Sequence, residues 1–423
     1  MAQLAVIGAG YVGLTSAACL AHLGHHVVCA DAAEERVAGL LRGESPIVEQ
    51  GLGELVKEGL RNGRLTFTTS NADAVAKAEF VLLCVPTPQA DDGRADMSFI
   101  RVVAAEIGPH LLSESIVITK STVPVGSTRV VEQTLGRVDV SVVSNPEFLR
   151  EGSAVHDFLH PDRIVIGADD ESTAVKVAAM FSRTSAPLVV TDPASAETIK
   201  YASNAFLATK LSFVNGMAAL CEAVGADIRQ VVLGMGFDRR IGSDFLRPGP
   251  GWGGSCLPKD VTALVHTAEE VGYDFALLRG AIRANEEQYQ RMADKAVRMA
   301  GGSVDGRVVA IWGLTFKART DDLRHSPSLE IATRLTTMGA RVRGYDPTVR
   351  GPLPGIEICA DPYAACEGAS VVVLGTEWDE LRWLDFAKVA ELMVVRAIVD
   401  CRNLLEPAAV RRHGFAYEGV GLV

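Results

Sequence analysis

The chain contains no long apolar run, no cysteines at CxxC spacing and no excess of positive charge. No stretch of 18 or more apolar residues occurs, so a transmembrane helix is not expected. The 41 lysines and arginines are outnumbered by 52 acidic residues, which gives a formal net charge of −11 and argues against nucleic acid as the main partner. Low-complexity segments and short repeats are also absent. With 48% apolar residues, the composition is that of a folded globular protein.

The eight cysteines are scattered, and most lie in apolar runs where they would serve as buried packing residues. The opening MAQLAVIGAG has a strand pattern and shows no basic segment before a cleavable apolar stretch. We therefore expect a cytoplasmic protein without disulfides or membrane association. The nine histidines, His156 and His160 among them, form no cluster with metal-ligand spacing, so we predict no catalytic metal.

Short apolar, β-branched runs alternate with amphipathic segments, which predicts an α/β fold with doubly wound parallel sheets. The expected buried parallel strands of the first half are Leu4–Ile7, Val27–Ala30, Phe80–Val85, Ile116–Thr119, Val140–Ser144 and Ile164–Ile166. A second α/β part begins near Gly306, with expected strands at Val308–Trp312, Arg341–Tyr345, Val371–Gly375 and Ala397–Asp400. The two parts echo each other, since each has a strand, a glycine turn, a helix and then a strand that ends in Asp.

Residues 194–224 lie between the two α/β parts and contain no proline, so they predict one long helix that begins after Pro193 and ends at Gly225. Its apolar residues cover more than one face, which favours a domain spacer and a subunit contact in a homodimer. Further helices are expected at Val261–Val271 and about Phe275–Ala300. We divide the 423 residues into three domains, at 1–195, 196–300 and 301–423.

The first strand runs into Gly8-Ala9-Gly10-Tyr11-Val12-Gly13, a GxGxxG motif that opens a helix. In this context the motif predicts a dinucleotide site. Gly8 would permit the tight turn, Gly10 would let a pyrophosphate approach the backbone, and Gly13 would permit close helix–strand packing. The helix N-terminus would present its positive end to the phosphates.

Asp31 ends the second strand, 18 residues after Gly13. A carboxylate there would bond the ribose 2′-hydroxyl and repel a 2′-phosphate, which favours NAD over NADP. Arg36 lies close enough in sequence to leave NADP open. A flavin dinucleotide uses the same fingerprint and is also an alternative at this point, as is a glycine turn without a ligand.

Five further segments follow in a fixed order: VPTP at Val85–Pro88, KSTVPVGS at Lys120–Ser127, NPEFLREGSAVHDFLHPDRIVIG at Asn145–Gly167, FLRPGPGWGGSCLPKD at Phe245–Asp260 and GLTFKARTDDLRHSPS at Gly313–Ser328. Over nearly the whole chain these segments resemble the UDP-glucose/GDP-mannose 6-dehydrogenase family. The resemblance implies two Rossmann-like domains joined by a long central helix and a helical middle domain. It makes residues 1–195 the NAD-binding domain, 196–300 the dimerisation domain and 301–423 the UDP-sugar-binding domain.

Within the family the chain is most similar to the members that oxidise UDP-glucose. The residue before Cys256 is Ser255, whereas members acting on UDP-N-acetylhexosamines have GGHC there. GDP-mannose members share GGSC, so GDP-mannose or another nucleotide sugar is the alternative substrate. The resemblance implies an NAD-dependent oxidoreductase acting on CH–OH. It would carry out the four-electron oxidation of UDP-glucose to UDP-glucuronate, for polysaccharide biosynthesis.

Cys256 lies in a glycine-rich loop ahead of a predicted helix, and Lys259 follows it. A helix N-terminus and a lysine could both lower the thiol pKa. A nucleophilic thiol makes sense if an aldehyde must be oxidised, because the aldehyde has no good hydride to give until a nucleophile adds to it. We expect a thiohemiacetal and then a thioester on Cys256, against the alternative of a structural cysteine.

Lys200 and Asn204 are spaced i, i+4 and share one helix face. The resemblance directs both at the reacting oxygen, where they would stabilise an alkoxide or oxyanion; the alternative is a solvated polar stripe. Asp260 could hold a water or act as a general base, and it could also be the N-cap of the helix predicted from Val261.

Glu147 and Glu151 are also spaced i, i+4, and together they could position and deprotonate the water that attacks a thioester. Thr122 could orient that water. A salt bridge from Glu151 to Arg150 or Arg163 is the alternative reading of that carboxylate.

The remaining site residues are assigned by resemblance. Substrate contacts are expected from Glu147, Phe148, Leu149, Lys200, Asn204, Arg240, Phe245, Leu246, Gly249, Gly253, Lys317 and Arg402. Lys317 and Arg402 would meet the diphosphate, and Arg240 would reach the sugar across the subunit interface. Cofactor contacts are expected from Gly8, Gly10, Tyr11, Val12, Gly13, Asp31, Arg36, Pro86, Thr87, Ser121, Thr122, Glu151, Lys259 and Arg324.

Two rival classes are alternatives to this interpretation. The first is a two-electron dehydrogenase of 3-hydroxy acids, which would need neither the Cys256 loop nor a second nucleotide-binding half. The second is a non-catalytic NAD-sensing protein, in which replacement of Cys256, Lys200 or Asn204 would be expected. All three residues are present.

Overall fold

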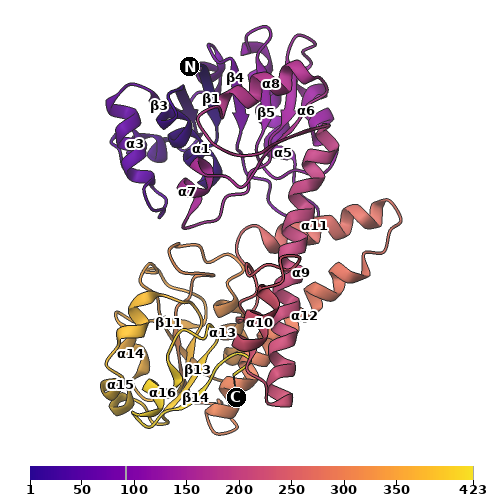
Figure 1. Ribbon diagram of the computed structural model, residues 1–423. Helices are drawn as coiled ribbons and strands as arrows, with labels where there is room; N and C mark the ends of the chain where they lie inside the picture. The colour runs from indigo at the N-terminus through magenta and orange to yellow at the C-terminus, as the bar shows by residue number, and fades with distance from the viewer. Residues whose placement is uncertain (91–92, 423) are drawn as a thin grey trace. The chain divides into compact units, whose positions relative to one another are not determined.

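The computed structural model describes residues 1–90 and 93–422. The chain divides into two compact units (Figure 1). Unit 1 consists of Met1–Ser203 with Thr262–Thr267, and unit 2 consists of Asn204–Val261 with the described chain from Ala268 onward. In the part of the chain that the structure describes, no helix is long and apolar enough to cross a membrane.

Unit 1 contains one eight-stranded sheet in the order β3-β2-β1-β4-β5-β6-β7-β8. Its strands are β1 Gln3–Ile7, β2 His26–Ala30, β3 Leu65–Thr68, β4 Phe80–Leu83, β5 Ile116–Thr119, β6 Ser141–Ser144, β7 Ile164–Gly167 and β8 Leu188–Thr191. Six of the strands match the predicted runs to within two residues at either end, while β3 and β8 were not predicted.

The strand at β7 corrects one expectation. Ile164–Ile166 was predicted as another parallel strand, but β7 runs antiparallel to β6 and meets it only at Ser144 and Gly167. It is parallel only to β8. A short, fully buried apolar run is compatible with either direction, because the run itself carries no information on how the chain returns to the sheet.

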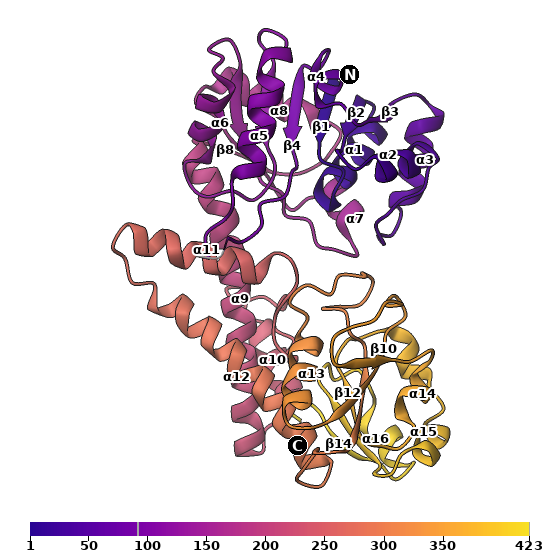
Figure 2. The ribbon, with the colours of Figure 1, turned by 180° about the vertical axis from the view of Figure 1, so that it is seen from behind.

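Helices cover both faces of this sheet (Figures 1 and 2). Alternate residues of β1 face opposite ways, so Leu4 and Val6 join one core cluster while Ala5 and Ile7 join the other. The first cluster includes side chains of α1 Tyr11–His22, α2 Glu34–Leu41, α3 Leu52–Arg61, α7 Ala154–Leu159 and α8 Glu171–Met180. The second includes α4 Asn71–Val75, α5 Ser98–Ile107 and α6 Ser127–Leu135, and a 3-10 turn, η1 Gly108–His110, follows α5. The sheet is therefore doubly wound.

The long central helix is present as α9, Pro193–Val224, and it ends at Gly225, whose φ is 75°. It is followed by α10 Ile228–Gly236, α11 Leu257–Glu270 and α12 Ala276–Met299. The predicted helix from Val261 thus begins four residues earlier, at Leu257, because Pro258 is accommodated in its first turn.

Unit 2 contains a six-stranded, fully parallel sheet in the order β11-β10-β9-β12-β13-β14. Its strands are β9 Val308–Trp312, β10 Arg341–Tyr345, β11 Ile356–Ile358, β12 Ala369–Leu374, β13 Ala397–Asp400 and β14 Ala416–Glu418. One core cluster contains side chains of α9, α10, α12 and α13 Pro327–Thr337. The other contains α14 Pro362–Cys366, α15 Phe386–Leu392 and α16 Pro407–Arg411, with the 3-10 turn η2 Asp379–Trp383 beside them. The α/β class and the doubly wound second half are as predicted.

Candidate active site

The first glycine turn joins β1 to α1 and has the geometry that a dinucleotide requires. Gly8 has a φ of 98°. An added Cβ at Gly13 would lie 1.8 Å from the carbonyl oxygen of Gly8, so only glycine lets α1 begin this close to the turn. An added Cβ at Gly10 would meet nothing within 4 Å. A pyrophosphate therefore has room against the backbone at the N-terminus of α1.

Asp31 follows β2 and bonds both the turn and Arg36. Its Oδ2 accepts the Ala9 N–H at 2.8 Å and lies 3.0 Å from the Arg36 Nη1. The Asp31 side chain is 11% exposed. Because the Arg36 guanidinium is already paired with this carboxylate, the local charges favour the 2′-hydroxyl of NAD over a 2′-phosphate.

Four more predicted cofactor residues follow β4 and β5. These strands are parallel to β1, so the four residues lie at the same end of the strands as the first glycine turn. The Ser121 hydroxyl donates to the Val85 carbonyl at 2.6 Å, and the Thr87 hydroxyl donates to the Thr122 carbonyl at 2.8 Å. Thr87, Ser121 and Thr122 are buried, whereas Pro86 is exposed. The segment that carries Thr122 is thus tied by side chains to the segment after β4.

Tyr11 reaches from the turn to a carboxylate that the sequence did not single out. Its hydroxyl donates to Glu49 and accepts the Gly152 N–H at 3.0 Å, and burial raises the Tyr11 pKa above its ordinary value. Glu49 also accepts the N–H groups of Gly152 at 2.7 Å and Ala154 at 2.9 Å. The neighbouring Val12 is half-buried. Glu49 therefore fastens the first turn to the segment just after Glu151.

Lys200 and Glu147 form a buried ion pair in unit 1. The Lys200 Nζ lies 2.9 Å from the Glu147 Oε1, and each side chain is 5% exposed. The other oxygen of Glu147 accepts the Leu149 N–H at 2.6 Å. Burial alone would raise the pKa of Glu147, but the charge and hydrogen bond of Lys200 hold it below its ordinary value. The solvated-stripe reading of Lys200 is therefore wrong.

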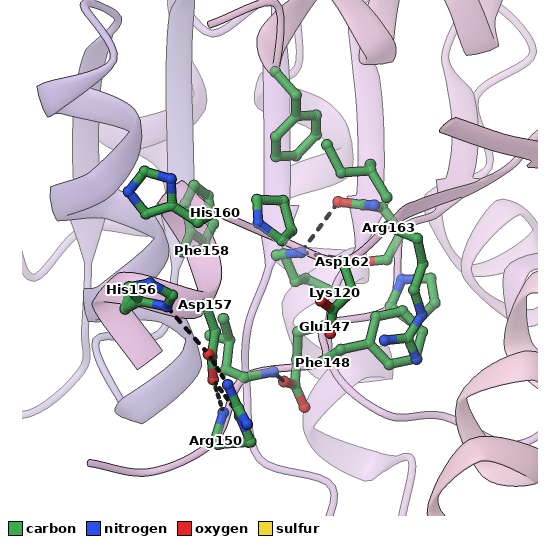
Figure 3. A pocket seen from close by; sticks show the side chains of 16 residues that line it. Lys120, Glu147, Phe148, Arg150, His156, Asp157, Phe158, His160, Asp162 and Arg163 are labelled. Carbon is green, nitrogen blue, oxygen red and sulfur yellow. Dashed lines mark hydrogen bonds and ion pairs between the residues drawn. The ribbon is translucent and has the colours of Figure 1, made fainter. Parts of the chain in front are cut away.

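Phe148 makes cation–π contacts with two cations, with the Arg163 guanidinium 3.6 Å and the Lys200 Nζ 5.4 Å from its ring centroid. Glu147, Phe148 and Arg163 line a cavity in unit 1 (Figure 3). The volume of this cavity is about 110 Å³. Lys120 also lines it, donating to the Asn145 Oδ1 at 3.1 Å, and burial lowers the pKa of this lysine. The segment after β6 is thus held by buried polar and cation–π contacts.

Glu151 is half-buried in the same segment. Its neighbour Arg150 bonds the Asp157 carboxylate, with a closest contact of 2.6 Å from Nη2, and Arg163 stacks on Phe148 as described. The paired-carboxylate role of Glu147 and Glu151 stays a prediction.

Cys256 is the N-cap residue of α11 and is half-buried. Its sulfur lies 3.5 Å from the Ser255 hydroxyl. A helix N-terminus carries partial positive charge, which stabilises a thiolate. The expected position of the thiol at a helix start is confirmed, although the helix begins beside Cys256 and not at Val261.

Asp260 lies within the first turn of α11, so the N-cap reading is wrong. It is fully buried, and its carboxylate accepts hydrogen bonds from the Asn204 Nδ2 at 2.6 Å and the Lys259 Nζ at 2.5 Å. Asn204 is 7% exposed and therefore does not belong to a solvated stripe. Three of the predicted residues thus share one hydrogen-bonded cluster, one helical turn from Cys256.

The glycine loop before Cys256 is held by polar side chains that the sequence analysis missed. Asn285 accepts the Trp252 N–H at 2.8 Å and donates to the Trp252 carbonyl at 2.9 Å. Asn215 accepts the Gly249 N–H and Gln288 donates to the Gly249 carbonyl. Their signal in the sequence is polar residues at core positions of α9 and α12, the same signal that pointed to Lys200 and Asn204.

Gly253 was predicted as a substrate contact, and the structure shows a further reason why a glycine stands at this position. An added Cβ would lie 1.8 Å from the carbonyl oxygen of His325, so it is the chain's own backbone that approaches Gly253. An added Cβ at Gly249 would have its nearest neighbour, the Arg402 Nη1, at 3.6 Å. Phe245 has a φ of 58° and is half-buried, and Leu246 is buried.

A second glycine turn joins β9 to the segment that carries Lys317. Asp346, only 1% exposed, accepts the Leu314 N–H at 2.8 Å and the Trp378 Nε1–H at 3.0 Å. The half-buried Lys317 lies 5.4 Å above the Phe316 ring.

Arg402, after β13, donates to the Phe316 carbonyl at 2.7 Å and the Gly375 carbonyl at 2.9 Å. The two predicted diphosphate residues are therefore linked through Phe316.

The two remaining predicted arginines each pair with an aspartate two residues earlier. The closest contacts, both 2.6 Å, are Arg240 with Asp238 and Arg324 with Asp322. The Arg240 side chain is 89% exposed. Neither pair shows a ligand role, and both roles stay predictions.

Three family models match the chain in order. They describe the NAD binding domain (residues 2–185), the central domain (194–287) and the UDP binding domain (310–407) of the UDP-glucose/GDP-mannose dehydrogenase family. The chain therefore belongs to this family and is an NAD-dependent dehydrogenase. The UDP-binding match sets aside the rival class of 3-hydroxy acid dehydrogenases.

Individual relatives agree along the whole length. The chain is 46% identical to a UDP-glucose 6-dehydrogenase of Pseudomonas aeruginosa, covering 99% of this chain and 97% of the relative. It is 44% identical to one of Rhizobium meliloti, covering 99% of each. The structure is similar to that of a UDP-glucose dehydrogenase from Pyrobaculum islandicum, with a TM-score of 0.91, 38% identity, and 100% and 98% of the two chains covered.

Proposed function

We propose that this enzyme oxidises UDP-glucose to UDP-glucuronate, with two NAD consumed per sugar nucleotide and Cys256 as the nucleophile. The family, the relatives named as UDP-glucose 6-dehydrogenases and the first glycine turn support the substrate and the cofactor. One observation carries the four-electron chemistry, namely a half-buried thiol at the start of α11, one helical turn from the Asn204–Asp260 hydrogen bond. A two-electron alcohol oxidation has no use for that thiol.

The Gly8–Gly13 turn would hold the NAD pyrophosphate and Asp31 its ribose, and bound NAD would supply the hydride acceptor for each oxidation. In the first oxidation Asp260 accepts the proton of the C6 hydroxyl. The Asn204 amide and the Lys200 ammonium stabilise the developing alkoxide, since both are donors with little exposure to competing water.

The Cys256 thiolate then adds to the C6 aldehyde. A carbon–sulfur bond forms, and the carbonyl oxygen takes up a proton to give a thiohemiacetal. Loss of that proton and of a hydride from C6 leaves a thioester. The thiohemiacetal also keeps the aldehyde bound between the two oxidations.

Hydrolysis completes the reaction. Water adds its oxygen to the thioester carbon and gives its proton to a carboxylate, for which we propose Glu147 with Glu151. The carbon–sulfur bond breaks, the Cys256 thiolate leaves and a carboxylate product remains. Thr122 orients the water, and Glu147 begins as the ionised partner of Lys200, the form that can accept a proton.

We assign the uridine diphosphate to unit 2. Lys317 and Arg402 bind the diphosphate, and Phe245, Leu246 and Gly249 contact the nucleotide and sugar. The pairing of Arg402 with main-chain carbonyls supports this role indirectly, because it fixes the turn that carries Lys317.

We further propose a cytoplasmic homodimer formed through α9. Phe206, Phe213, Leu220 and Val224 are spaced at helical intervals and are 67%, 52%, 52% and 67% exposed. Arg240 would then reach the partner's sugar. Light scattering should report two chains for the wild type and one for Phe213→Glu; a monomeric wild type would contradict the proposal.

The first test is the amount of NADH formed per sugar nucleotide at limiting substrate, with UDP-glucose and GDP-mannose in parallel. Two NADH per UDP-glucose are expected. Two per GDP-mannose with none from UDP-glucose would keep the mechanism and overturn the substrate. One NADH would mean that the aldehyde escapes and would overturn the role of Cys256.

Cys256→Ser tests the thioester directly. Serine is a far poorer nucleophile and an oxygen ester lacks the thiolate leaving group, so the second NADH should be slowed by at least about 100-fold. Completion of both oxidations at the wild-type rate would contradict the thioester route.

A further inference from the structure

Glu197 is a buried carboxylate in the first turns of α9 that neither the sequence analysis nor the proposed mechanism uses. The residue is 2% exposed. Its Oε2 accepts the Gly126 N–H at 2.6 Å, and its Oε1 accepts the Thr128 N–H at 2.8 Å and the Thr128 hydroxyl at 2.7 Å. Each of these three donors lies at the N-terminus of α6.

The start of α6 has no side-chain cap of its own. Its N-cap residue is Gly126, which has a φ of 93° and supplies no side-chain acceptor. Helix N-termini leave backbone N–H groups unsatisfied, and a neighbouring carboxylate is the strongest acceptor for them. Glu197 thus supplies the cap from a different helix.

The cap fixes the far end of the Thr122 segment, by which we mean residues 121–126. The near end is fixed by the Ser121 hydroxyl on the Val85 carbonyl and by the Thr87 hydroxyl on the Thr122 carbonyl. Loss of Glu197 would remove the side-chain acceptor of the Gly126 N–H at the far end, while the bonds at the near end would remain.

Glu197 and Lys200 are three residues apart on α9, so they lie on neighbouring positions of one rigid helix. Lys200 holds Glu147 at 2.9 Å. One helix therefore holds the far end of the Thr122 segment through Glu197 and holds Glu147 through Lys200. The proposed mechanism gives Thr122 and Glu147 to the hydrolytic water, and gives neither of them to the thiol addition.

We propose that Glu197 is a positioning residue for thioester hydrolysis, holding the Thr122 segment in register with the Lys200–Glu147 pair. The inference rests on the proposed function. Loosening the far end of the segment misplaces the water that must form the new carbon–oxygen bond. The hydride and thiol steps continue, because the near end, with the predicted cofactor contact Ser121, keeps its own bonds. The thioester on Cys256 then accumulates, because the carbon–sulfur bond breaks more slowly than it forms.

The test variant is Glu197→Gln, which keeps size but turns an N–H donor toward backbone N–H groups. After mixing with UDP-glucose and excess NAD, NADH is followed by absorbance and the Cys256 adduct by intact-mass spectrometry of quenched samples. We expect the pre-steady-state NADH rate to stay within about 2-fold of wild type while steady-state turnover falls at least about 10-fold. The thioester should become the dominant enzyme form.

Two further variants keep the test decisive. Thr128→Val removes one of the three hydrogen bonds and should raise the adduct fraction less, even if Glu197→Gln folds poorly. The matched control is Glu222→Gln, a second α9 carboxylate that bonds the Lys295 Nζ and the Gly421 N–H. It should lower the melting temperature without raising the adduct fraction.

Equal slowing of NADH formation and adduct decay, or a lower melting temperature with no adduct, would overturn the positioning role. An adduct rise of the same size in Glu222→Gln would also overturn it. A wild type that forms one NADH per UDP-glucose would instead overturn the proposed function, so the two failures are distinguishable.

Discussion

The two glycine turns of this protein have the same backbone arrangement. Gly8 and Gly313 have φ values of 98° and 82°. Each donates its N–H, at 2.7 Å, to the last residue of the next strand, Ala30 in unit 1 and Tyr345 in unit 2. In each unit the following aspartate accepts the N–H of the residue after the glycine at 2.8 Å, Ala9 to Asp31 and Leu314 to Asp346.

The turns differ in the elements that come after them. In unit 1 helix α1 begins at Tyr11, so its N-terminus lies directly at the turn. In unit 2 helix α13 begins only at Pro327, and the intervening segment carries Lys317. Asp31 keeps an exposed fraction of 11%, whereas Asp346 is almost fully buried.

These differences show how one strand–turn–strand arrangement can hold two kinds of nucleotide. In unit 1 backbone N–H groups and an accessible carboxylate suit a dinucleotide. In unit 2 the carboxylate is used internally, and the charge that suits the diphosphate of a sugar nucleotide is that of Lys317, which we propose as the diphosphate contact.

The largest effect is expected from alanine in either turn. The added Cβ of Gly13→Ala would lie 1.8 Å from a backbone oxygen, and that of Gly313→Ala 2.4 Å from the Thr376 Cβ. Gly13→Ala should weaken NAD binding by at least about 100-fold, about 2.7 kcal/mol, and leave UDP-glucose binding within about 3-fold. Gly313→Ala should do the reverse. Calorimetric titration with each ligand measures both, and parallel losses in both variants would break the comparison.

The second largest effects are expected from substitution of the two turn aspartates, Asp31 and Asp346, which should differ in their effect on stability. Asp346→Asn replaces a buried acceptor of several donors and should cost about 2–4 kcal/mol of unfolding free energy. Asp31→Asn should lower the free energy of unfolding by about 1 kcal/mol or less. It should raise the KM for NAD about 10-fold and so reduce the preference of the enzyme for NAD over NADP. Urea unfolding and cofactor kinetics on the same preparations measure the two effects. Similar stability losses would contradict the internal role of Asp346.

Lys317→Ala should act on one ligand only. Loss of a single phosphate contact should raise the KM for UDP-glucose about 10-fold, with the KM for NAD unchanged. Lys388→Ala, a surface lysine 4.0 Å above the Tyr363 ring in unit 2, is the control and should change neither constant. An altered KM for NAD in Lys317→Ala would contradict the assignment.

The smallest effect is an opposite contribution to stability in acid from two buried carboxylates, Glu147 in unit 1 and Asp400 in unit 2. The folded-state pKa of Glu147 is lowered, so its contribution to stability is present above the ordinary pKa of about 4.3 and lost as the pH falls. Burial raises the pKa of Asp400 in unit 2, so its contribution is present in acid and lost as the pH rises. Each contribution should be on the order of 1 kcal/mol.

Hydrogen exchange of β1 and β9 between pH 7 and pH 4 measures this response. The protection of β1 should fall relative to that of β9. Parallel loss in the two strands would contradict the expected difference.

The sheet interiors could be predicted from the sequence, whereas the sheet edges could not. The four strands that were missed, β3, β8, β11 and β14, are the four outermost strands of the two sheets. Edge strands are buried on fewer sides, and β3 and β11 alternate apolar and polar residues where a central parallel strand has a continuous apolar run. β8 differs, because Leu188, Val189 and Val190 form an apolar run, yet all three are exposed.

In the candidate site, too, some residues could be predicted from the sequence and others could not. Residues with a chemical signature, such as Cys256 and Lys200, could be selected from the sequence. Glu197 could not, because its role depends on which distant backbone groups lie beside it. Such long-range partners follow from the fold and not from spacing along the chain.

Helix α9 passes from one compact unit to the other between Ser203 and Asn204, without interruption. Lys200 and Asn204 therefore share one helix face only as long as they stay four positions apart in the sequence. One inserted residue would rotate the face that follows it by about 100°. A chimera that takes the chain from Asn204 onward from a relative must therefore be joined within this helix without any gain or loss of residues. A junction in a loop tolerates a change of length. A junction within α9 does not, because the helix fixes the angle between the residues before and after it.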